Sequence, residues 1–244
     1  MKIGKRVYGA VFKQGGSVGH PLTGRYKLKG IMREYCLKIV DFKIELDEEL
    51  QQLSHKKGYF PSIDPVSYGK AIFPFWDDDI SARRSAIPID CYEVVGGNFQ
   101  DYTNHDKSVK ACKQLNASAS GGFGAPSYHK VGTFPIYFAW EGKNRVSLFR
   151  KHGLDIIADV KDTTYPMANT LKIHRCFFRK LYFLSCSDKS FNAKNKKHQI
   201  AFPELTIPLL EAYGVENGSK LFKPFTINCR RKTIKALCAG LMRG

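Results

Sequence analysis

Features that define several common protein classes are missing from this sequence. It contains no apolar run near the roughly 18 residues that a membrane-spanning helix needs, and residues 1–16 lack the apolar core of a secretory signal. Its seven cysteines are scattered and never form a Cys-x-x-Cys pair, which argues against a disulfide framework and a zinc finger. We therefore expect a soluble cytoplasmic protein with reduced, structural thiols and no membrane partner. The spacing of the seven histidines does not match that of metal ligands, so whether the chain has a metal site stays unknown.

The proportion of apolar residues is high enough for a folded core. Of the 244 residues, 43% are hydrophobic and 25% are charged, whereas disordered chains combine low hydrophobicity with high net charge. The length suits one domain with appendages or two small domains. Segments that favour strands and segments that favour helices both occur. We expect an α+β fold whose central domain has a mixed sheet, followed by a basic helical C-terminal region.

Acidic residues are scarce at the two ends of the chain. The net charge is +17, yet residues 34–170 carry 18 acidic and 16 basic side chains. Residues 1–33 carry eight Lys and Arg and no acid, and residues 171–244 carry 15 basic and four acidic residues. Because clustered Lys and Arg neutralise phosphates, we expect both ends to contact a polyanion such as DNA. Charge that only keeps the chain soluble is the alternative.

Local patterns predict the secondary structure of the first third of the chain. Residues 35–44 favour a strand, and residues 47–58 favour a short helix with acids in its first turn. Residues 58–76 contain three prolines and two glycines, so we expect an irregular linker. The acidic run 77–79 is interpreted as the solvated start of a helix, with ligation of a hard cation as the alternative.

The central region has a clearer order of elements. We predict a strand over 87–95, a helix over 106–115, a glycine-rich loop over 118–126 and a strand buried on both faces over 134–140. The last strand runs into Glu-Gly-Lys-Asn-Arg at 141–145, then into a helix that Gly153 ends and a strand over 154–160. Trp140 is expected in the core, with a base-stacking role as the alternative.

The turn at 141–145 has the pattern of an anion-binding site. A buried strand that passes through a glycine turn into a helix aims the first N–H groups of the helix at whatever lies above the strand. Lys143 and Arg145 add positive charge and donors for phosphate. The structural alternative is that Arg145 pairs with Glu141 or Asp155.

The order of these elements resembles the ParB/sulfiredoxin superfamily. The matching segments are IPID at 87–90, DKSVKACKQL at 106–115, SASGGFG at 118–124 and FPIYFAWEGKNRVSLFRKHG at 134–153, so the resemblance covers about residues 85–160. It implies that Gly142, Asn144 and Arg145 contact nucleotide phosphates. It also implies that Gly121 and Gly122 lie near the same site.

The chain departs from this superfamily at Lys143. Sulfiredoxins have cysteine there, so reduction of a sulfinic acid is not expected. ParB-type proteins have Glu, so Lys143 removes an acid and adds a cation that would hold phosphate, which favours binding over turnover. Some members are nucleases or kinases, which need a carboxylate base or metal ligand. The candidate catalytic residues are Glu141 and Asp90, with Glu93 and residues 77–79 left open.

The basic C-terminal end supplies most of the predicted DNA contacts. Residues 218–244 contain seven basic residues and no acid. The segment 206–215 is similar to the first helix and turn of a helix-turn-helix, with a second short helix expected after Asn217. The candidate DNA-binding residues are Arg230, Arg231, Lys232, Lys235, Lys196 and Lys197.

Together these patterns predict a basic N-terminal segment and linker (1–80), a ParB/sulfiredoxin-like domain (81–165) and a basic, largely helical C-terminal region (166–244). The expected function is nucleotide binding in a DNA-associated protein of a plasmid, phage or other mobile element, acting in partition, regulation or defence. A DNA nuclease, NTPase or phosphotransferase is one alternative. A nucleotide-independent adaptor or inhibitor of a DNA-processing complex is another. The expected cofactor is a nucleoside triphosphate, with its identity, an accompanying Mg²⁺ and a homodimer left open.

Overall fold

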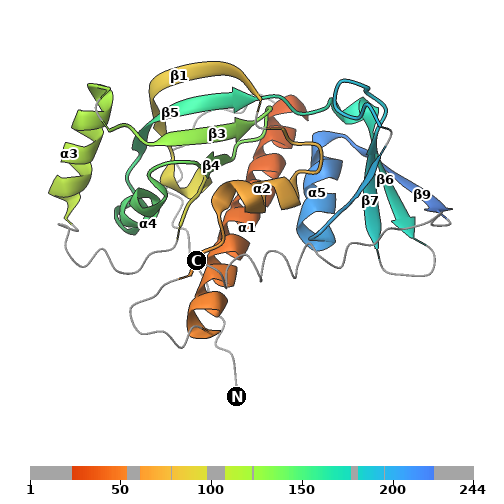
Figure 1. Ribbon diagram of the computed structural model, residues 1–244, viewed down its shortest axis with the longest axis horizontal. Helices are drawn as coiled ribbons and strands as arrows, with labels where there is room; N and C mark the ends of the chain where they lie inside the picture. Colours follow the sequence, from red (N-terminus) through yellow and green to blue (C-terminus); the bar gives the residue numbers. More distant parts are fainter. Residues whose placement is uncertain are drawn as a thin grey trace, which may run out of the picture.

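The computed structural model describes residues 24–53, 61–77, 79–97, 108–122, 124–176, 181–194 and 196–222. These residues form five α-helices and two β-sheets, and each sheet contains both parallel and antiparallel strand pairs. The predicted combination of helices with a mixed sheet is thus confirmed. Figure 1 shows the two sheets at opposite ends of the structure, with α1, α2 and α5 between them.

The first sheet has five strands in the order β1-β5-β3-β4-β2. Its strands are β1 (Ile80–Ile89), β2 (Val94–Val95), β3 (Ser127–Val131), β4 (Tyr137–Ala139) and β5 (Ile156–Thr163). The pairs β1/β5 and β3/β4 are antiparallel, and β3/β5 and β2/β4 are parallel. The strand expected over 87–95 is interrupted, because Asp90 caps a short 3₁₀ helix, η1 (Cys91–Glu93), between β1 and β2.

The first helix, α1, spans Gly24–Leu53, so the strand predicted over 35–44 is wrong. The helix expected from residue 47 is the end of this longer one. Its buried side chains recur every three to four residues, which places them on one face of a helix: Cys36, Ile39, Val40, Lys43 and Asp47. The β-branched and aromatic residues of this segment favour strands only weakly, and packing of this face decides the outcome.

A second helix, α2 (Pro65–Ile72), lies where an irregular linker was expected. Asp64 caps it by accepting a hydrogen bond from the N–H of Ser67, and Pro65 occupies the first helical position. Both are common helix-starting residues. Gly69 lets α2 approach the first sheet closely, since a Cβ there would lie 2.8 Å from the Phe138 ring. No helix follows the acidic run, because β1 begins at Ile80.

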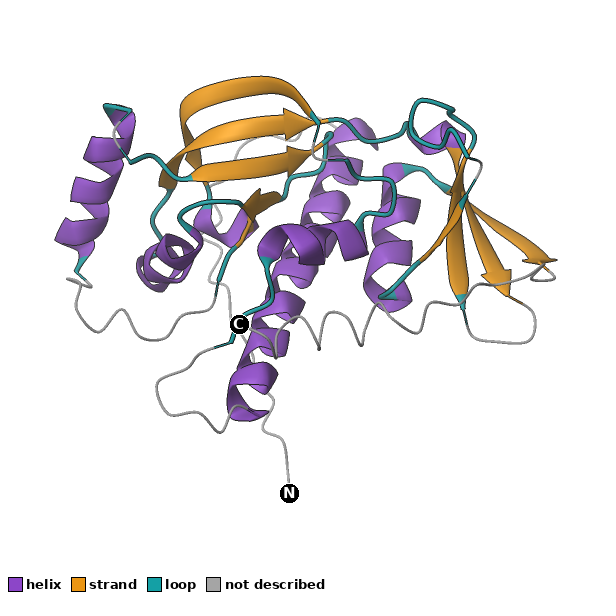
Figure 2. Ribbon diagram, in the orientation of Figure 1, coloured by secondary structure: helices purple, strands orange, loops and turns teal. Residues whose placement is uncertain are grey.

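One face of the first sheet is covered by α3 (Val109–Ser120) and α4 (Lys143–His152) (Figure 2). The helix expected over 106–115 therefore begins and ends a few residues later. The helix expected over 146–152 begins at Lys143, and Gly153 ends it as predicted, in the left-handed conformation. Cys112 of α3 and Phe149 of α4 pack on Tyr128, Ala139 and neighbouring strand residues.

The opposite face of the first sheet belongs to a larger core that also includes the second sheet. The second sheet has the order β8-β7-β6-β9, formed by β6 (Leu171–Cys176), β7 (Tyr182–Cys186), β8 (Lys197–Gln199) and β9 (Glu216–Phe222). A short 3₁₀ helix, η2 (Ala168–Thr170), precedes it, and α5 (Pro203–Tyr213) packs against it.

The sequence predicted a largely helical C-terminal region, but the described part of that region has a different structure. Residues 166–222 contain four strands and one α-helix. The segment after Asn217 belongs to β9, parallel to β6, so a helix-turn-helix does not form there. Helix α5 ends at Gly214 as its pattern indicated, but the chain then enters the sheet. Among the described residues, no helix is long and apolar enough to cross a membrane.

Candidate functional site

The turn between β4 and α4 has the geometry that the sequence predicted. Gly142 adopts a left-handed conformation, with φ of 71°, immediately before the first helical residue. A Cβ at this position would lie 2.5 Å from the Cβ of Pro126, so glycine is required for close contact with the loop before β3. Gly142 has no side chain to cap α4, so within the described structure the first N–H groups of this helix have no side-chain cap.

Arg145 lies on the side of this turn that faces the glycine-rich loop. A Cβ added to Gly124 would be 3.9 Å from Nη2 of Arg145, which places the guanidinium beside the loop. The expected alternative, an ion pair with Glu141 or Asp155, does not form, and Arg145 has no carboxylate partner among the described residues. Its positive charge is therefore uncompensated at the positive end of α4.

A buried hydroxyl lies within electrostatic reach of Arg145. The Tyr128 side chain is fully buried, and its hydroxyl has no hydrogen-bond partner among the described residues. Burial raises the pKa of Tyr128, and the positive charge of Arg145 opposes that rise. Buried polar groups are rarely left unpaired. The Tyr128 hydroxyl therefore stays protonated and is able to donate a hydrogen bond close to the turn.

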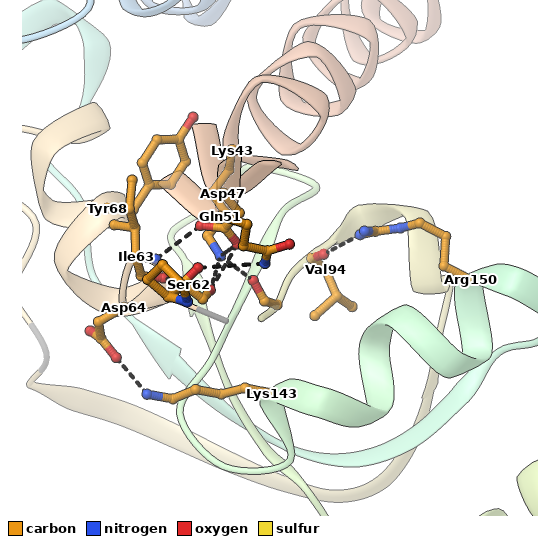
Figure 3. Close-up of polar contacts among 12 residues, drawn as sticks. Lys43, Asp47, Gln51, Ser62, Ile63, Asp64, Tyr68, Val94, Lys143 and Arg150 are labelled. Atoms are coloured by element: carbon orange, nitrogen blue, oxygen red, sulfur yellow. Dashed lines mark hydrogen bonds and ion pairs between the residues drawn. The ribbon is translucent and has the colours of Figure 1, made fainter. Parts of the chain in front are cut away.

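On the other side of the turn, Lys143 is paired with the residue that caps α2. Its ammonium donates to the carboxylate of Asp64 at 2.5 Å (Figure 3). Burial alone would raise the pKa of Asp64, but the hydrogen bonds from Lys143 and Ser67 outweigh it and lower this pKa. Lys143 therefore bridges α4 and α2, and part of its charge is neutralised in the structure.

A buried ion pair in α1 organises the backbone around Lys143 (Figure 3). Lys43 and Asp47 are 1% and 0% exposed and form a salt bridge one helical turn apart. Lys43 also donates to the carbonyl of Gly96 at 2.6 Å, and Asp47 accepts from the N–H of Ile63 at 2.9 Å. Burial lowers the pKa of Lys43, while the charge of Asp47 opposes that shift.

The two segments held by this pair both reach α4. The segment that contains Ile63 continues directly to Asp64, the partner of Lys143. The segment that contains Gly96 continues to Gly97, whose N–H donates to the carbonyl of Lys143 at 3.1 Å. A Cβ on Gly96 would lie 2.9 Å from that same carbonyl oxygen, so the approach is close. The buried pair therefore positions the first residue of α4 from two directions.

A pocket opens between α2 and the turn. Its volume is about 490 Å³, and its lining residues are Asp64, Val66, Ser67, Lys70, Trp140 and Lys143. Trp140 was expected in the core, but 47% of its surface is exposed. It follows the short strand β4, and its ring contacts the ring of His129 and lies under the ammonium of Lys161 at 5.9 Å. An aromatic side chain thus borders a pocket that also contains both charge signs.

The two candidate catalytic carboxylates are not brought together. Asp90 caps η1, before β2, and accepts a hydrogen bond from Arg33 of α1 at 2.8 Å. Glu141 follows β4, which runs parallel to β2. The two residues therefore lie at opposite ends of this strand pair. Glu93 is also occupied, since it accepts from Arg33 at 2.6 Å. The backbone N–H of Glu141 donates to the carbonyl of Ser127, but its carboxylate has no hydrogen-bond or ion-pair partner within the described part of the chain.

The N–H groups of the two loop glycines named from the sequence are used within the chain. The N–H groups of Gly121 and Gly122 donate to the carbonyls of Ala117 and Ala119, at 3.3 Å and 2.9 Å. They therefore complete the C-terminal end of α3 and are not directed at a ligand. Gly124, two residues later, is the glycine that lies beside Arg145.

Most of the candidate DNA-binding residues cannot be placed. Arg230, Arg231, Lys232 and Lys235 lie outside the described residues. Lys197 is the first residue of β8 and Lys196 precedes it, and both side chains are exposed. Within the described ranges, no group of three or more His, Cys, Asp and Glu could hold a metal ion. The cysteines that the structure places are buried and not joined in disulfides: Cys36, Cys91, Cys112, Cys176 and Cys186.

Several residues of the site were not found from the sequence. The pattern Asp64-Pro65 is a helix-starting signal that the neighbouring prolines obscured. Lys43, Asp47 and Tyr128 carry no local signal, because their roles depend on partners distant in the chain. Comparisons with protein-family models, with curated proteins and with solved structures find no match to this chain.

Proposed function

We propose that this chain binds a nucleotide, with the phosphates at the start of α4, in a domain of the ParB/sulfiredoxin type. The observation that carries the proposal is Arg145, whose guanidinium has no carboxylate partner among the described residues and lies beside the first turn of α4. A helix N-terminus and a guanidinium both attract phosphate oxygens. The buried hydroxyl of Tyr128 adds a donor with no partner of its own in the described chain.

The pocket next to Lys143 suits the remainder of a nucleotide. Ligand pockets commonly have volumes of about 300–1,000 Å³, and this one measures about 490 Å³. The exposed ring of Trp140 offers an aromatic surface for the base. A base in this pocket would place its phosphates near Lys143 and the turn, from where they would extend toward Arg145.

Binding is favoured over turnover in this proposal. Hydrolysis or phosphoryl transfer needs a positioned carboxylate base or a metal ligand. Asp90 is held by Arg33, and Glu141 lies at the opposite end of the β2/β4 pair. We propose that any Mg²⁺ enters with the nucleotide. The second candidate function is that of a nuclease, NTPase or phosphotransferase. It requires the separated carboxylates to act through the bound metal.

DNA is the partner that we propose for the basic ends of the chain, with nucleotide binding altering how those ends engage it. The support is the charge distribution, with 23 of the 39 Lys and Arg in residues 1–33 and 171–244. Equal DNA affinity with and without nucleotide would contradict the coupling without affecting the nucleotide site.

The nucleotide site is tested by calorimetric titration of the four common nucleoside triphosphates with Mg²⁺ into the wild-type chain and two variants. Arg145→Ala removes charge-assisted hydrogen bonds of about 1.5–3 kcal/mol, so the Kd should rise about 10- to 100-fold. Lys151→Ala, at an exposed position of the same helix, is the matched control and should bind like the wild type. The proposal fails if no nucleotide binds, or if the two variants bind equally well.

Tryptophan fluorescence gives a second measurement of the same site. The chain has two tryptophans, and Trp76 is only 6% exposed whereas Trp140 is 47% exposed. Nucleotide binding should change the emission of Trp140, and Trp140→Phe should abolish that change. If the change in emission persists in Trp140→Phe, the base does not bind in this pocket.

A further inference from the structure

The second sheet has one face in the core and one face turned away from it. Leu171, Ile173, Leu184 and Cys186 point inward and pack with α5 in the larger core. Because side chains alternate along strands, the residues between them lie on the other face. No described helix covers this outer face, whereas α5 lies on the inner side (Figure 1). On β6, β7 and β8, the residues of the outer face are Lys172, His174, Phe183, Ser185, Lys197 and Gln199.

Positive charge is gathered on this outer face. Lys172 pairs across the strands with Ser185, and Ser185 pairs with Lys197, so the two lysines flank one serine. The Lys172 side chain lies over β9, since a Cβ on Gly218 would be 2.7 Å from its Cε. Glu216, opposite Lys172 on β9, is the acid on this face of the described sheet. Two lysines and one acid leave this face with a net positive charge, which attracts an anion.

Two flat side chains lie side by side among these cations. His174 and Phe183 are directly opposite each other in the β6/β7 register, and Phe183 is also opposite Gln199 of β8. Phe183 is half-buried and belongs to neither hydrophobic core. Nε2 of His174 is 2.8 Å from Oγ of Ser185, which holds the imidazole on this face. Burial, followed by the nearby Lys197 and Lys172, lowers the pKa of His174, which favours the neutral ring.

The segment before β8 carries Lys196, whose backbone is held by hydrogen bonds with Asn192. Asn192 is buried, and its side-chain amide donates to the carbonyls of Cys186 and Lys196. Its Oδ1 accepts from the N–H of Lys196 at 2.7 Å. These contacts fix the backbone at Lys196, so the fold sets the position of this lysine next to the sheet.

We propose that the outer face of the second sheet binds single-stranded nucleic acid. Exposed bases of a single strand stack on aromatic side chains, and a basic surface follows their phosphates. A duplex does not present unstacked bases, so the paired rings of His174 and Phe183 select the single strand. Lys172, Lys197 and Lys196 contact the phosphates. The inference rests on the DNA association proposed for residues 171–244 and specifies its form. It is separate from nucleotide binding at α4, because no residue is shared between the two surfaces.

The test measures binding of the full chain to fluorescently labelled oligo(dT) and oligo(rU) of 12 residues, without nucleotide, by anisotropy over a series of salt concentrations. In Lys172→Ala/Lys197→Ala, the slope of log K against log salt should become shallower by about 1.4, at about 0.7 per lost single-strand phosphate contact. Lys110→Ala/Lys113→Ala removes the same charge from exposed positions of α3, at the far end of the structure, and is the matched control.

A second variant separates stacking from charge. Phe183→Leu keeps an apolar side chain but removes the ring, so the Kd should rise about 5- to 100-fold while the salt slope stays unchanged, since stacking contributes about 1–3 kcal/mol. Circular dichroism and the melting temperature verify that each variant is folded. The proposal is overturned if both lysine pairs have equal effects or if Phe183→Leu binds like the wild type. Tighter binding of a duplex, or of vesicles that contain phosphatidylserine, overturns it as well.

Discussion

Lys143 of α4 donates a hydrogen bond to Asp64, the residue that caps α2, over a distance of 2.5 Å. The contact joins two helices that begin 78 residues apart in the chain, and it lies in the wall of the pocket. Lys143 is also the position where the sequence departs from the ParB-type pattern that we propose for this domain. The ion pair therefore competes with any phosphate for the same ammonium group.

Asp64→Asn should strengthen nucleotide binding. The substitution removes a carboxylate that both neutralises Lys143 and repels phosphate, an effect of about 1 kcal/mol or about fivefold in Kd. Calorimetric titration with the nucleotide that binds the wild-type chain measures the change. Glu204→Gln, at an exposed position of α5, is the control for loss of one negative charge. Weaker binding of Asp64→Asn would mean that the ligand contacts Asp64 directly.

The same carboxylate should make stability depend on pH in acid. The pKa of Asp64 is lower in the folded protein than the value of about 3.9 in the unfolded chain. Its contribution is therefore present above pH 4 and is lost as pH falls through the folded value, because the unfolded state then binds more protons. Denaturant unfolding of the wild type and Asp64→Asn between pH 2.5 and pH 7 should show a difference that disappears at the acid end. A constant difference would exclude this linkage.

Breaking the buried pair in α1 should affect both stability and the site. Lys43→Met leaves Asp47 buried without its cation, at a cost of about 3–5 kcal/mol in the free energy of unfolding. In Lys43→Met/Asp47→Leu, much of this loss should be recovered, because no charge remains buried. Chemical denaturation measures both variants.

The nucleotide affinity of these variants shows whether the buried pair positions the site or only stabilises the fold. The double variant regains stability but lacks the contacts of the pair with Gly96 and Ile63, so the nucleotide Kd should remain raised by about tenfold. Affinity that recovers together with stability would show that the pair has no positioning role.

Gly142→Ala should destabilise the protein strongly. The left-handed backbone and the 2.5 Å approach to Pro126 both oppose a Cβ, and the expected loss is about 2–4 kcal/mol. Gly30→Ala in α1 is the matched control, since its Cβ would meet nothing within 4 Å. This control should be neutral or stabilising by about 0.5–1 kcal/mol, as alanine favours helices. Equal melting temperatures for the two variants would contradict the close contact at Gly142.

The segment from 134 to 153 shows how far local patterns predict this fold. The strand expected over 134–140 is confined to Tyr137–Ala139, and α4 begins at Lys143 rather than at Val146. Gly142 in the turn and Gly153 at the end of α4 occur as expected, because glycine has access to the left-handed region. The strand predicted over 35–44 was wrong, since weak β-propensity was overridden by packing of one helical face. The helix after Asn217 was wrong because β9 pairs with β6, about 45 residues earlier.

The sequence by itself determined the separation of charge, the glycine turn at Gly142 and the helix that follows it, because these follow from composition and from contacts between near neighbours. Only the tertiary structure decided that Lys143 is paired with Asp64, that Arg145 has no carboxylate partner among the described residues, and that Trp140 borders a pocket. It also decided that His174 and Phe183 share one face of a sheet. These relationships join residues from different elements, and burial and strand register, which no local pattern specifies, set their distances.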